Sequence, residues 1–530
     1  MKKRIILFFS VFVGASIFGN LISAQENEQK ETVWPSGELT LQEAYEKTPV
    51  GGTLRILRGE HSVSGTLIVR KDIKILGEDE QDCAKNVLLG DTENVLRLES
   101  GFAEVKNLTL KNTGDSESPR APEKSAVQVC SPSSVFENCH FISVSGNGFS
   151  VVQKDAAPTV TRCTAKGCGN GGFFIAGGAK GNFTECESSG NTALGISVRG
   201  LGTEPTVEKC RFIGTAKGSG ILVLDGARGT FKECESSRNA RTGIQIAGNQ
   251  TDPTITLCRF LAGKGDGILV LDGARGTFTG CESSGNVRSG ITVRKAGPTV
   301  DKSQFTQNQL AGIETADGAF GLFRECESSR NRKYGFMALN RGTEPVVLNC
   351  RFSENGQSGI YVFSGARGEF RECESVGSHL AGIEICGAGT DPSVLKCRFT
   401  DIRGNGIYVY SEASGTFSEC ESSGNADGIV VLYAGTDPTV KDCRIEKNIR
   451  GIVLSENAEG TFRNNMLAEN EKGDWFIHDS SSPARIGNSP NTGNSAEQAQ
   501  NAEKEQKKNA ENETQRSWRP REHLRLRWFR

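Results

Sequence analysis

A single residue type recurs along this chain at a nearly constant interval. Successive cysteines stand 23 or 24 residues apart, and Ser303 fills the missing place in the one long gap, between Cys281 and Cys326. About one interval after the last cysteine stands Asn465. The cysteines in this register form a predicted structural ladder: Cys139, Cys163, Cys186, Cys210, Cys234, Cys258, Cys281, Cys326, Cys350, Cys373, Cys397, Cys420 and Cys443. A fixed period of this length, built from Val/Ile alternation and glycine punctuation without helical periodicity, predicts stacked β coils.

Two versions of one unit follow each other between residues 220 and 260. The first reads GILVLDGARGTFKECESSRN and the second reads GIQIAGNQTDPTITLCRF. Each begins with a Gly-Ile strand, passes through a glycine-rich turn into a second short strand, and reaches its cysteine before another turn. We interpret each version as one coil of a solenoid, in which every coil contacts only its neighbours.

The repeat resembles that of a known fold family. It has the form VxxCxF from Val347 to Phe352, followed by Asn355 and by GIxV from Gly359 to Val362. This is similar to the right-handed parallel β-helix repeat of pectin-lyase-like proteins. The paired coils with GARGTF and DPTV also resemble the β-helix segments of F-box-type proteins and of bacterial carbohydrate-binding and periplasmic β-helix proteins. The resemblance implies an all-β, single-stranded right-handed parallel β-helix solenoid, and it leaves the activity open because such folds host lyases, hydrolases, epimerases and noncatalytic binders.

The N-terminus has the features of an export signal. Lys2, Lys3 and Arg4 precede an apolar run that ends in small residues at Ser23 and Ala24, which predicts a signal peptide over residues 1–24. An uncleaved membrane anchor is the alternative, because the apolar run approaches spanning length. Since nothing later is apolar enough to span a membrane, the mature chain is expected in the periplasm, in the cell envelope or outside the cell.

Residues 25–49 are expected to lead into the β-helix and to cap it. Residues 25–37 are polar, which predicts a loose segment, whereas Thr40 and Glu43 form a capping box that opens a short helix, LQEAYEK. We expect this helix to cover the first coil, because the open end of a β-helix exposes unpaired strand edges.

The β-helix itself is expected over residues 50–480, with a polar insertion at 113–125 that predicts a projecting loop. Trp475 and Phe476 are placed to close the last coil. Residues 481–530 are rich in Ser, Asn, Gln, Glu and Lys, which cannot bury a core, and therefore predict a disordered tail. The tail ends in a basic and aromatic run, SWRPREHLRLRWFR, which is either solvated or in contact with an acidic surface.

Seventeen cysteines in an exported chain raise the question of disulfides. Those of the ladder would be stacked about 4.8 Å apart, like the strands of a sheet. Our interpretation is a column of small buried thiols at an inward bend, a place where the pectin-lyase-like resemblance implies that Asn is common. Disulfides between neighbouring coils are the alternative, because distance alone permits them.

Charge is balanced overall and alternates locally. The net charge of −2 gives no reason to expect nucleic acid or an obligatory polyanion as a partner. The residue after the cysteine is acidic in one kind of coil, as at Glu187 and Glu235, and basic in the other, as at Arg211 and Arg259. A second alternation of basic and acidic residues lies six residues before the cysteine, and it includes Arg228. We interpret both as ladders that fix the register of the coils, with a charged ligand groove as the alternative.

No motif for catalysis or metal binding stands out. The five histidines are scattered, and the sequence has no HExxH, zinc-spaced Cys/His set, GxSxG or phosphate loop. Asp225 and Asp272 recur in equivalent turns, and Glu314 and Glu384 lie on Gly-Ile strands. Because an active site requires a local departure from the repeat, recurrence of this kind argues against catalysis. We therefore predict no catalytic residue, no metal and no cofactor.

One surface is a candidate for ligand binding. In GILVL, alternation directs Ile and Val inward and the leucines outward. The matching places of later coils hold Tyr361 and Phe363, then Tyr408 and Tyr410, with Glu384 on the coil between. Aromatic faces beside a carboxylate suit stacking on a sugar ring and hydrogen bonding to its hydroxyl groups. Coverage of this face by a loop, the tail or another subunit is the alternative.

Together these features favour an exported β-helix that binds carbohydrate or a cell-envelope polymer without catalysis. The first alternative is a pectin-lyase-like lyase, hydrolase or epimerase with a divergent site, for which we expect an acidic cluster beside the 113–125 insertion. The second is a protein–protein interaction solenoid, which the F-box-type resemblance allows. The predicted signal peptide and the lack of an F-box argue against an intracellular ubiquitin-ligase role.

Overall fold

The computed structural model describes residues 30–114, 124–478 and 480–488 of the chain. The predicted signal peptide, most of the 113–125 insertion and nearly all of the predicted tail lie outside the described residues. The chain divides into two compact units. The first runs to Arg351 without Leu339–Arg341, and the second consists of Leu339–Arg341 and the residues from Phe352 onward.

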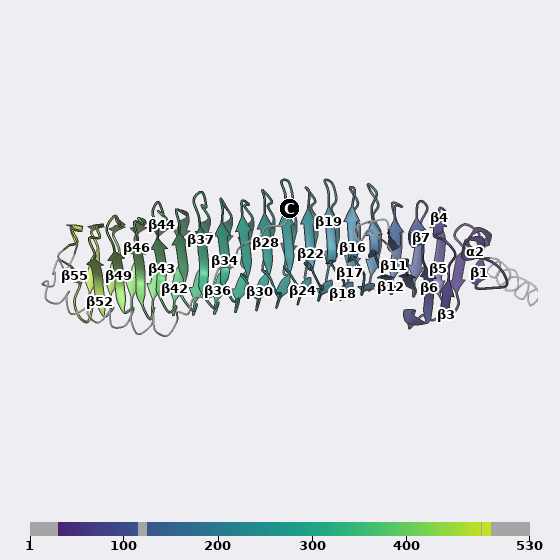
Figure 1. Ribbon diagram of the computed structural model, residues 1–530, viewed down its shortest axis with the longest axis horizontal. Helices are drawn as coiled ribbons and strands as arrows, with labels where there is room; N and C mark the ends of the chain where they lie inside the picture. The colour runs from purple at the N-terminus through teal and green to yellow at the C-terminus, as the bar shows by residue number, and fades with distance from the viewer. Residues whose placement is uncertain (1–29, 115–123, 479, 489–530) are drawn as a thin grey trace, which may run out of the picture. The chain divides into compact units, whose positions relative to one another are not determined.

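Each unit is a parallel β-solenoid. A coil contributes one strand to each of three sheets, named A, B and C, and each strand pairs in parallel with the equivalent strand of the next coil (Figure 1). This arrangement confirms the predicted all-β parallel β-helix. Within the described residues, the helical elements are α2 (Leu41–Lys47) and the short 3-10 helix η1 (Cys83–Lys85).

The first unit contains strands of all three sheets. Sheet A consists of β1 (Glu31–Trp34), β2 (Thr53–Ile56), β5 (Ile73–Gly77), β8 (Ala103–Lys106), β11 (Ser134–Glu137), β14 (Thr159–Thr161), β17 (Asn182–Thr184), β20 (Thr206–Glu208), β23 (Thr230–Lys232), β26 (Thr254–Thr256), β29 (Thr277–Thr279), β32 (Thr299–Asp301), β35 (Leu322–Arg324) and β38 (Val346–Leu348). Sheet B consists of β3 (Gly59–Ser62), β6 (Asn86–Gly90), β9 (Thr109–Asn112), β12 (His140–Ser143), β15 (Thr164–Lys166), β18 (Glu187–Ser189), β21 (Arg211–Ile213), β24 (Glu235–Ser237), β27 (Arg259–Leu261), β30 (Glu282–Ser284), β33 (Gln304–Thr306) and β36 (Glu327–Ser329). Sheet C consists of β4 (Leu67–Val69), β7 (Asn94–Leu98), β10 (Ser125–Val129), β13 (Asn147–Val151), β16 (Gly171–Ala176), β19 (Leu194–Arg199), β22 (Ile221–Leu224), β25 (Ile244–Ala247), β28 (Ile268–Leu271), β31 (Ile291–Arg294) and β34 (Ala311–Ala316).

The second unit has the same three sheets. Sheet A consists of β41 (Glu369–Arg371), β44 (Ser393–Leu395), β47 (Thr416–Ser418), β50 (Thr439–Lys441), β53 (Thr461–Arg463) and β56 (Ala484–Ile486). Sheet B consists of β42 (Glu374–Val376), β45 (Arg398–Thr400), β48 (Glu421–Ser423), β51 (Arg444–Glu446) and β54 (Met466–Ala468). Sheet C consists of β40 (Ile360–Phe363), β43 (Ala381–Cys386), β46 (Asn405–Tyr410), β49 (Asp427–Leu432), β52 (Arg450–Ser455) and β55 (Trp475–Ile477). Strands β37 (Tyr334–Leu339) and β39 (Arg351–Ser353) contain residues of both units.

Alternation along each strand determines the core. Ile221, Ile244 and Ile268 lie in register on successive strands of sheet C, and each is fully buried inside the coil. The stack therefore repeats isoleucine at these three levels. Because successive side chains of a strand point to opposite faces, the residues between these positions face outward.

The cysteine ladder is a column of free thiols. All seventeen cysteines are free and buried in the structure, as in our interpretation, and none is bridged to a neighbouring coil. The backbone N–H of Cys186 donates to Sγ of Cys210 on the next coil at 3.3 Å. Ser303 takes the same role, because its Oγ accepts the N–H of Cys281 at 3.1 Å. A cysteine, serine or asparagine fits this place because each offers an acceptor for a buried N–H group.

A second internal ladder is formed by asparagines. The Asn286 side chain donates to the carbonyl of Phe260 at 3.2 Å, and Oδ1 of Asn308 accepts the N–H of Asn286 at 3.1 Å. Asn308 is paired with Asn331 in the same way. These amides hold the turns of the coil together, so they are not available for a ligand.

The N-terminal end of the first unit is capped as predicted. Thr40 and Glu43 form the capping box of α2. Oη of Tyr45 accepts the N–H groups of Arg70 and Lys71 at 2.8 and 3.1 Å, just beyond β4. The helix thus satisfies N–H groups beside the first strand of sheet C. The prediction that residues 25–37 are loose was wrong, because β1 lies there and pairs with β2.

The C-terminal end of the second unit closes differently. Trp475 is fully buried in β55, the last strand of sheet C in the described part of the chain, where the sequence predicted a residue that closes the coil. One further strand, β56, lies beyond the expected boundary at residue 480. Arg485 of β56 stands in register with the inward-facing Phe462 of the preceding coil, and its guanidinium lies 5.1 Å from the centre of the Trp475 ring. Arg485 thus stands where the preceding coils place an inward-facing apolar side chain. The stack of buried apolar side chains ends at this charge.

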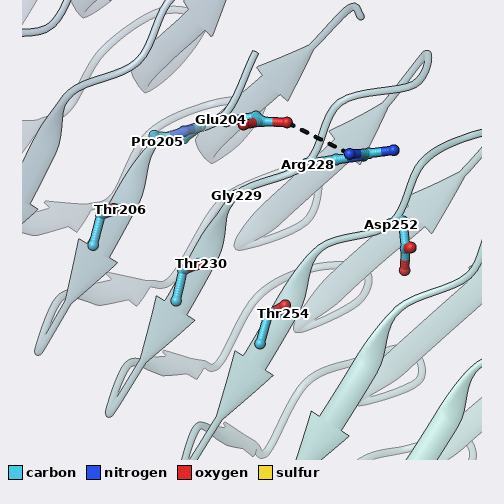
Figure 2. Close-up of a pocket in the computed structure, with 8 residues that line it drawn as sticks. All are labelled: Glu204, Pro205, Thr206, Arg228, Gly229, Thr230, Asp252 and Thr254. Carbon is cyan, nitrogen blue, oxygen red and sulfur yellow. Dashed lines mark ion pairs between the residues drawn. The ribbon is translucent and has the colours of Figure 1, made fainter. Parts of the chain in front are cut away.

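The charge ladders connect neighbouring coils. Arg259 lies 3.7 Å from Glu235 on one side and 3.0 Å from Glu282 on the other. In the second ladder, Arg228 lies 3.9 Å from Glu204 (Figure 2). These pairs are largely exposed, so each contributes at most about 1 kcal/mol. Their alternation nevertheless disfavours a slip by one coil, which supports the predicted structural role.

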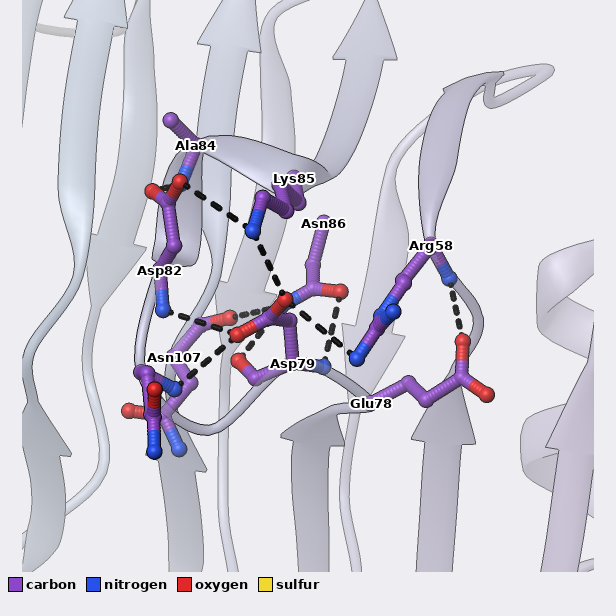
Figure 3. A network of polar contacts seen from close by, with 9 residues as sticks. Arg58, Glu78, Asp79, Asp82, Ala84, Lys85, Asn86 and Asn107 are labelled. Atoms are coloured by element: carbon purple, nitrogen blue, oxygen red, sulfur yellow. Dashed lines mark hydrogen bonds and ion pairs between the residues drawn. The ribbon is translucent and has the colours of Figure 1, made fainter.

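A polar network fastens the loop that leads from β5 into η1 (Figure 3). The Asp79 carboxylate accepts the N–H groups of Asp82 and Gln81 at 3.0 and 3.1 Å and pairs with Lys85 and Arg58 at 3.2 and 3.4 Å. The backbone hydrogen bonds, and then Lys85, hold the pKa of Asp79 below its ordinary range. Because backbone N–H groups and two cations already bind the Asp79 carboxylate, we interpret the network as structural. It holds the loop between β5 and η1 in place.

Candidate functional site

The predicted aromatic surface lies on the outer face of sheet C in the second unit. In β40, Ile360 and Val362 are fully buried inside the coil, so Tyr361 and Phe363 point outward. The parallel register aligns the outward residues of successive coils into an outer row: Tyr361, Glu384, Tyr408, Val430, Val453 and Phe476. A second row contains Phe363, Cys386, Tyr410 and Leu432. The structure therefore brings all five predicted site residues together on three adjacent coils.

The four aromatic rings form two stacked pairs. The rings of Tyr361 and Phe363 are 5.6 Å apart at an interplanar angle of 11°, and those of Tyr408 and Tyr410 are 4.4 Å apart at 22°. Phe363 is 37 % exposed, while the three tyrosines are half-buried. Stacking fixes the orientation of each ring, so an apolar face is held ready at Phe363.

Glu384 differs from the sequence-based expectation. We expected its carboxylate to face a ligand, but the residue is only 4 % exposed. Its two oxygens accept hydrogen bonds from Ser358 Oγ at 2.5 Å and from Tyr410 Oη at 2.8 Å. The aromatic side chains on the neighbouring coils are large enough to cover it, which a linear sequence does not show.

Burial shifts the ionisation of this cluster. It raises the pKa of Glu384 above its ordinary value, and the hydrogen bonds from Ser358 and Tyr410 oppose that shift only in part. Burial likewise raises the pKa of Tyr408 and Tyr410 above the usual phenol range. Both tyrosines are consequently neutral at physiological pH, and Tyr410 keeps the proton that it donates to Glu384.

Towards the C-terminus the outer row becomes apolar. Val430, Val453 and Phe476 form a buried cluster against which Tyr408 and Leu432 pack. Beside it, Arg450 makes two hydrogen bonds to Asp427 at 2.5 and 2.7 Å. The positive charge of Arg450 is therefore neutralised, and the accessible part of the site is its Tyr361–Phe363 end.

The first unit carries a pair of buried acids at sheet C, Glu314 on β34 and Asp266 just before β28. The sequence analysis considered Glu314 only as a recurring residue and did not consider Asp266. Asp266 and Glu314 are 4 % and 2 % exposed. The Asp266 carboxylate accepts the Ser289 N–H at 3.1 Å and the Thr292 hydroxyl at 2.9 Å. The Glu314 carboxylate accepts the Ser289 hydroxyl at 2.8 Å and an Arg294 N–H at 2.9 Å. Two carboxylates, from the coils on either side of Ser289, thus converge on that serine.

The sequence did contain a signal for this pair. The residue before the strand glycine is Ser219, Thr242 and Ser289 in neighbouring coils, whereas Asp266 breaks that series. Burial raises the pKa of Asp266, and the nearby Arg288 and the hydrogen bonds oppose the shift. This is a local departure from the repeat of the kind that an active site requires, and it lies apart in sequence from the 113–125 insertion.

Within the described ranges, no group of three or more His, Cys, Asp and Glu side chains is arranged to hold a metal ion. No helix in the described part of the chain has the length and hydrophobicity of a membrane span.

A family model described as the right-handed β-helix region matches residues 95–260, 243–399 and 339–490. No curated protein matches the chain in sequence. Among solved structures, the A-module of the mannuronan C-5 epimerase AlgE6 of Azotobacter vinelandii is 13 % identical with a TM-score of 0.41, over 62 % of this chain and 90 % of that one. The PL6 family alginate lyase AlyGC is 9 % identical with a TM-score of 0.29, over 87 % of this chain and 98 % of that one. Pectate lyase Pel9A is 16 % identical with a TM-score of 0.25, over 62 % of this chain and 74 % of that one.

Proposed function

The chain belongs to the right-handed β-helix family, and we propose that it is an exported member that binds carbohydrate or another cell-envelope polymer without altering it. The observation that supports this function is the array of stacked rings on sheet C of the second unit, with Phe363 at its exposed end. A flat apolar ring held in place suits the C–H face of a sugar, which stacks without requiring charge.

Glu384 has a positioning role in this proposal. Its buried carboxylate holds the Tyr410 hydroxyl, and the Tyr410 ring in turn stacks on Tyr408. The rings therefore lose little conformational freedom when a ligand binds, which favours affinity.

A glycan array with the mature chain tests this function. The variants are Phe363→Ala and the double variant Tyr361→Ala/Tyr408→Ala, with product analysis on every glycan that binds. Phe320→Ala is a matched control, because Phe320 is a 57 % exposed aromatic residue outside the site. Binding that both site variants lose and the control keeps, with no product, supports the proposal. Equal binding by all four proteins contradicts it.

Export is a separate part of the proposal and depends on residues 1–24. We expect a mature N-terminus at Gln25 and recovery of the protein from the periplasm, the envelope or the medium. N-terminal sequencing after cell fractionation measures both. A chain that starts at Met1 and remains with the membrane supports the uncleaved anchor instead.

The acid pair of the first unit favours a second candidate function, hydrolysis of a glycosidic bond. Because Asp266 and Glu314 are 4 % and 2 % exposed, this function requires the surrounding coils to part enough for a substrate to reach them. Many glycoside hydrolases place two carboxyl groups across the bond, one as the acid and one as the base or nucleophile. In this function Asp266, whose pKa is raised, protonates the leaving oxygen. Glu314, held by Ser289 and Arg294, is the second carboxylate.

Product analysis on polysaccharides distinguishes the two functions. New reducing ends that disappear in Asp266→Asn and in Glu314→Gln assign hydrolysis to the pair. Asp225→Asn is the matched control, since Asp225 is an exposed acid on a turn of the same unit with a φ of 59° that asparagine also adopts. If no polysaccharide yields products, or if the two site variants retain the activity, the acid pair is structural.

A further inference from the structure

A groove lies on the outer face of sheet A in the first unit, on the three consecutive strands β20, β23 and β26 (Figure 2). Its volume is about 530 Å³, which is within the usual range for ligand pockets. The lining residues are Glu204, Pro205, Thr206, Arg228, Gly229, Thr230, Asp252 and Thr254. The groove belongs to a different sheet from the aromatic site and from the acid pair.

The floor of the groove is a row of threonines. Thr206, Thr230 and Thr254 stand in register on successive strands and are exposed (Figure 2). Among the described residues, none of the three hydroxyl groups has a hydrogen-bond partner. The row therefore presents free hydroxyl groups about 4.8 Å apart along the stack.

These hydroxyl groups are held in fixed positions. The residues after them, Val207 and Phe231, are fully buried and anchor the strands. A β-branched side chain on a strand has a restricted χ1 angle, so threonine offers its hydroxyl with little conformational freedom to lose. Glycine is needed at position 229 for the backbone, because its φ is 122° and a Cβ there would lie 2.9 Å from the Pro205 carbonyl oxygen of the preceding coil.

The rim carries polar groups of both signs. Glu204 and Arg228 form an ion pair of 3.9 Å, and the Asp252 carboxylate has no partner among the described residues. The net charge of these three groups is −1, which disfavours an acidic polymer. Carboxylates accept hydrogen bonds from sugar hydroxyls and a guanidinium donates them, so the rim suits a neutral, hydroxyl-rich ligand.

We propose that this groove binds a neutral polysaccharide chain that runs along the stack of coils. The ligand's hydroxyls exchange hydrogen bonds with the threonine floor, while Glu204, Arg228 and Asp252 contact them from the rim. A polymer fits better than a small molecule because the threonine row continues on the next two strands as Thr277 and Thr299. This site is independent of the aromatic site in the second unit.

The test is affinity gel electrophoresis of the mature full-length chain in gels containing galactomannan, dextran or a soluble β-glucan, with alginate as an acidic polymer. The variant Thr206→Val/Thr230→Val/Thr254→Val removes three hydroxyls while keeping shape and β propensity. The matched control, Thr206→Ser/Thr230→Ser/Thr254→Ser, keeps the hydroxyls. We expect at least about tenfold weaker retardation by a neutral polymer for the valine variant and near wild-type retardation for the serine variant.

Three results overturn the proposal. The first is equal retardation of the wild type and the valine variant by every neutral polymer. The second is no retardation by any polymer, and the third is retardation by alginate alone. The Tyr361→Ala/Tyr408→Ala variant separates the two sites: if that variant loses all glycan binding and the valine variant loses none, the aromatic site stands and the groove does not. Circular dichroism of each variant verifies that the β-helix is intact.

Discussion

The carboxylate of Glu384 accepts a hydrogen bond of 2.8 Å from the phenolic hydroxyl of Tyr410 on the next coil. Ser358, on the coil before, donates to the other oxygen. One buried acid therefore links three coils and orients the rings that we propose as the ligand surface. An acid at the centre of a binding surface need not contact the ligand in order to shape it.

Replacement of Glu384 by glutamine has an expected pH signature. Burial raises the pKa of Glu384 above its ordinary value of 4.5, so the folded chain holds this proton more tightly than the unfolded chain does. The contribution of this group to the free energy of unfolding is therefore greatest below that pH and decreases as pH rises through 4.5 towards the higher folded-state pKa. We expect the stability of Glu384→Gln relative to the wild type to increase as pH rises above 4.5, as measured by urea denaturation at several pH values. Glu459→Gln, at an exposed position, is the control, and a difference that does not change with pH contradicts the prediction.

The cysteines are expected to be inert in the folded chain, because all seventeen are buried where a thiol reagent cannot reach them. Burial raises the pKa of Cys281 to about 11, so its reactive thiolate is scarce at neutral pH. We expect no reaction with Ellman's reagent under native conditions and titration of all seventeen thiols in guanidinium chloride. Titration of fewer than seventeen thiols after unfolding without reductant would reveal disulfides. Rapid reaction of the native chain would show that the stacked cysteines are accessible to the reagent.

Substitutions at Cys258 separate its hydrogen bond from its volume. Sγ of Cys258 accepts the backbone N–H of Cys234 at 3.4 Å. We expect Cys258→Ser to be tolerated, because Ser303 already serves this role in another coil. Cys258→Ala leaves the buried N–H unpaired and should cost about 1–3 kcal/mol in the free energy of unfolding. Equal stability of the two variants in chemical denaturation is the contrary result.

The contact between Arg485 and Trp475 leads to a prediction about association. Arg485→Ala removes the cation–π contact with Trp475 and is expected to cost about 0.5–2 kcal/mol. Arg485→Phe instead continues the inward apolar column and removes the charge, so we expect concentration-dependent association through the exposed strand edges. Sedimentation velocity measures this, with Arg463→Ala as a control on the outward side of β53. A monomeric Arg485→Phe variant at every concentration would show that the end is protected by other means.

Two structural roles could be predicted from the sequence, one from the repeat of the coils and one from local residue chemistry. The equivalence of Ser303 with the cysteines follows from spacing, and the structure gives its reason in the N–H of Cys281. The capping box at Thr40 follows from local residue chemistry. In contrast, β1 was not predicted, because a strand of only four residues is stabilised by pairing with β2 and not by its own pattern.

The candidate sites were only partly predictable. Alternation correctly placed Tyr361 and Tyr408 on the outside of the coil, but the burial of Glu384 depends on side chains from the coils on either side. The convergence of Asp266 and Glu314 on Ser289 joins residues that the sequence separates by two coils.

The sequence alone was enough to establish the period of the coils, because the cysteine ladder repeats one hydrogen-bond acceptor in successive coils. It was also enough to show which side chains point inward, because side chains alternate along a strand. It was not enough to distinguish the outward polar groups that the protein already uses from those that it leaves open. Glu384 is satisfied by Ser358 and Tyr410, whereas the hydroxyls of Thr206 and Thr230 have no partner among the described residues. The reason is that hydrogen-bond satisfaction depends on distances of a few ångströms between coils, which the stacking of the folded chain sets and a linear pattern does not.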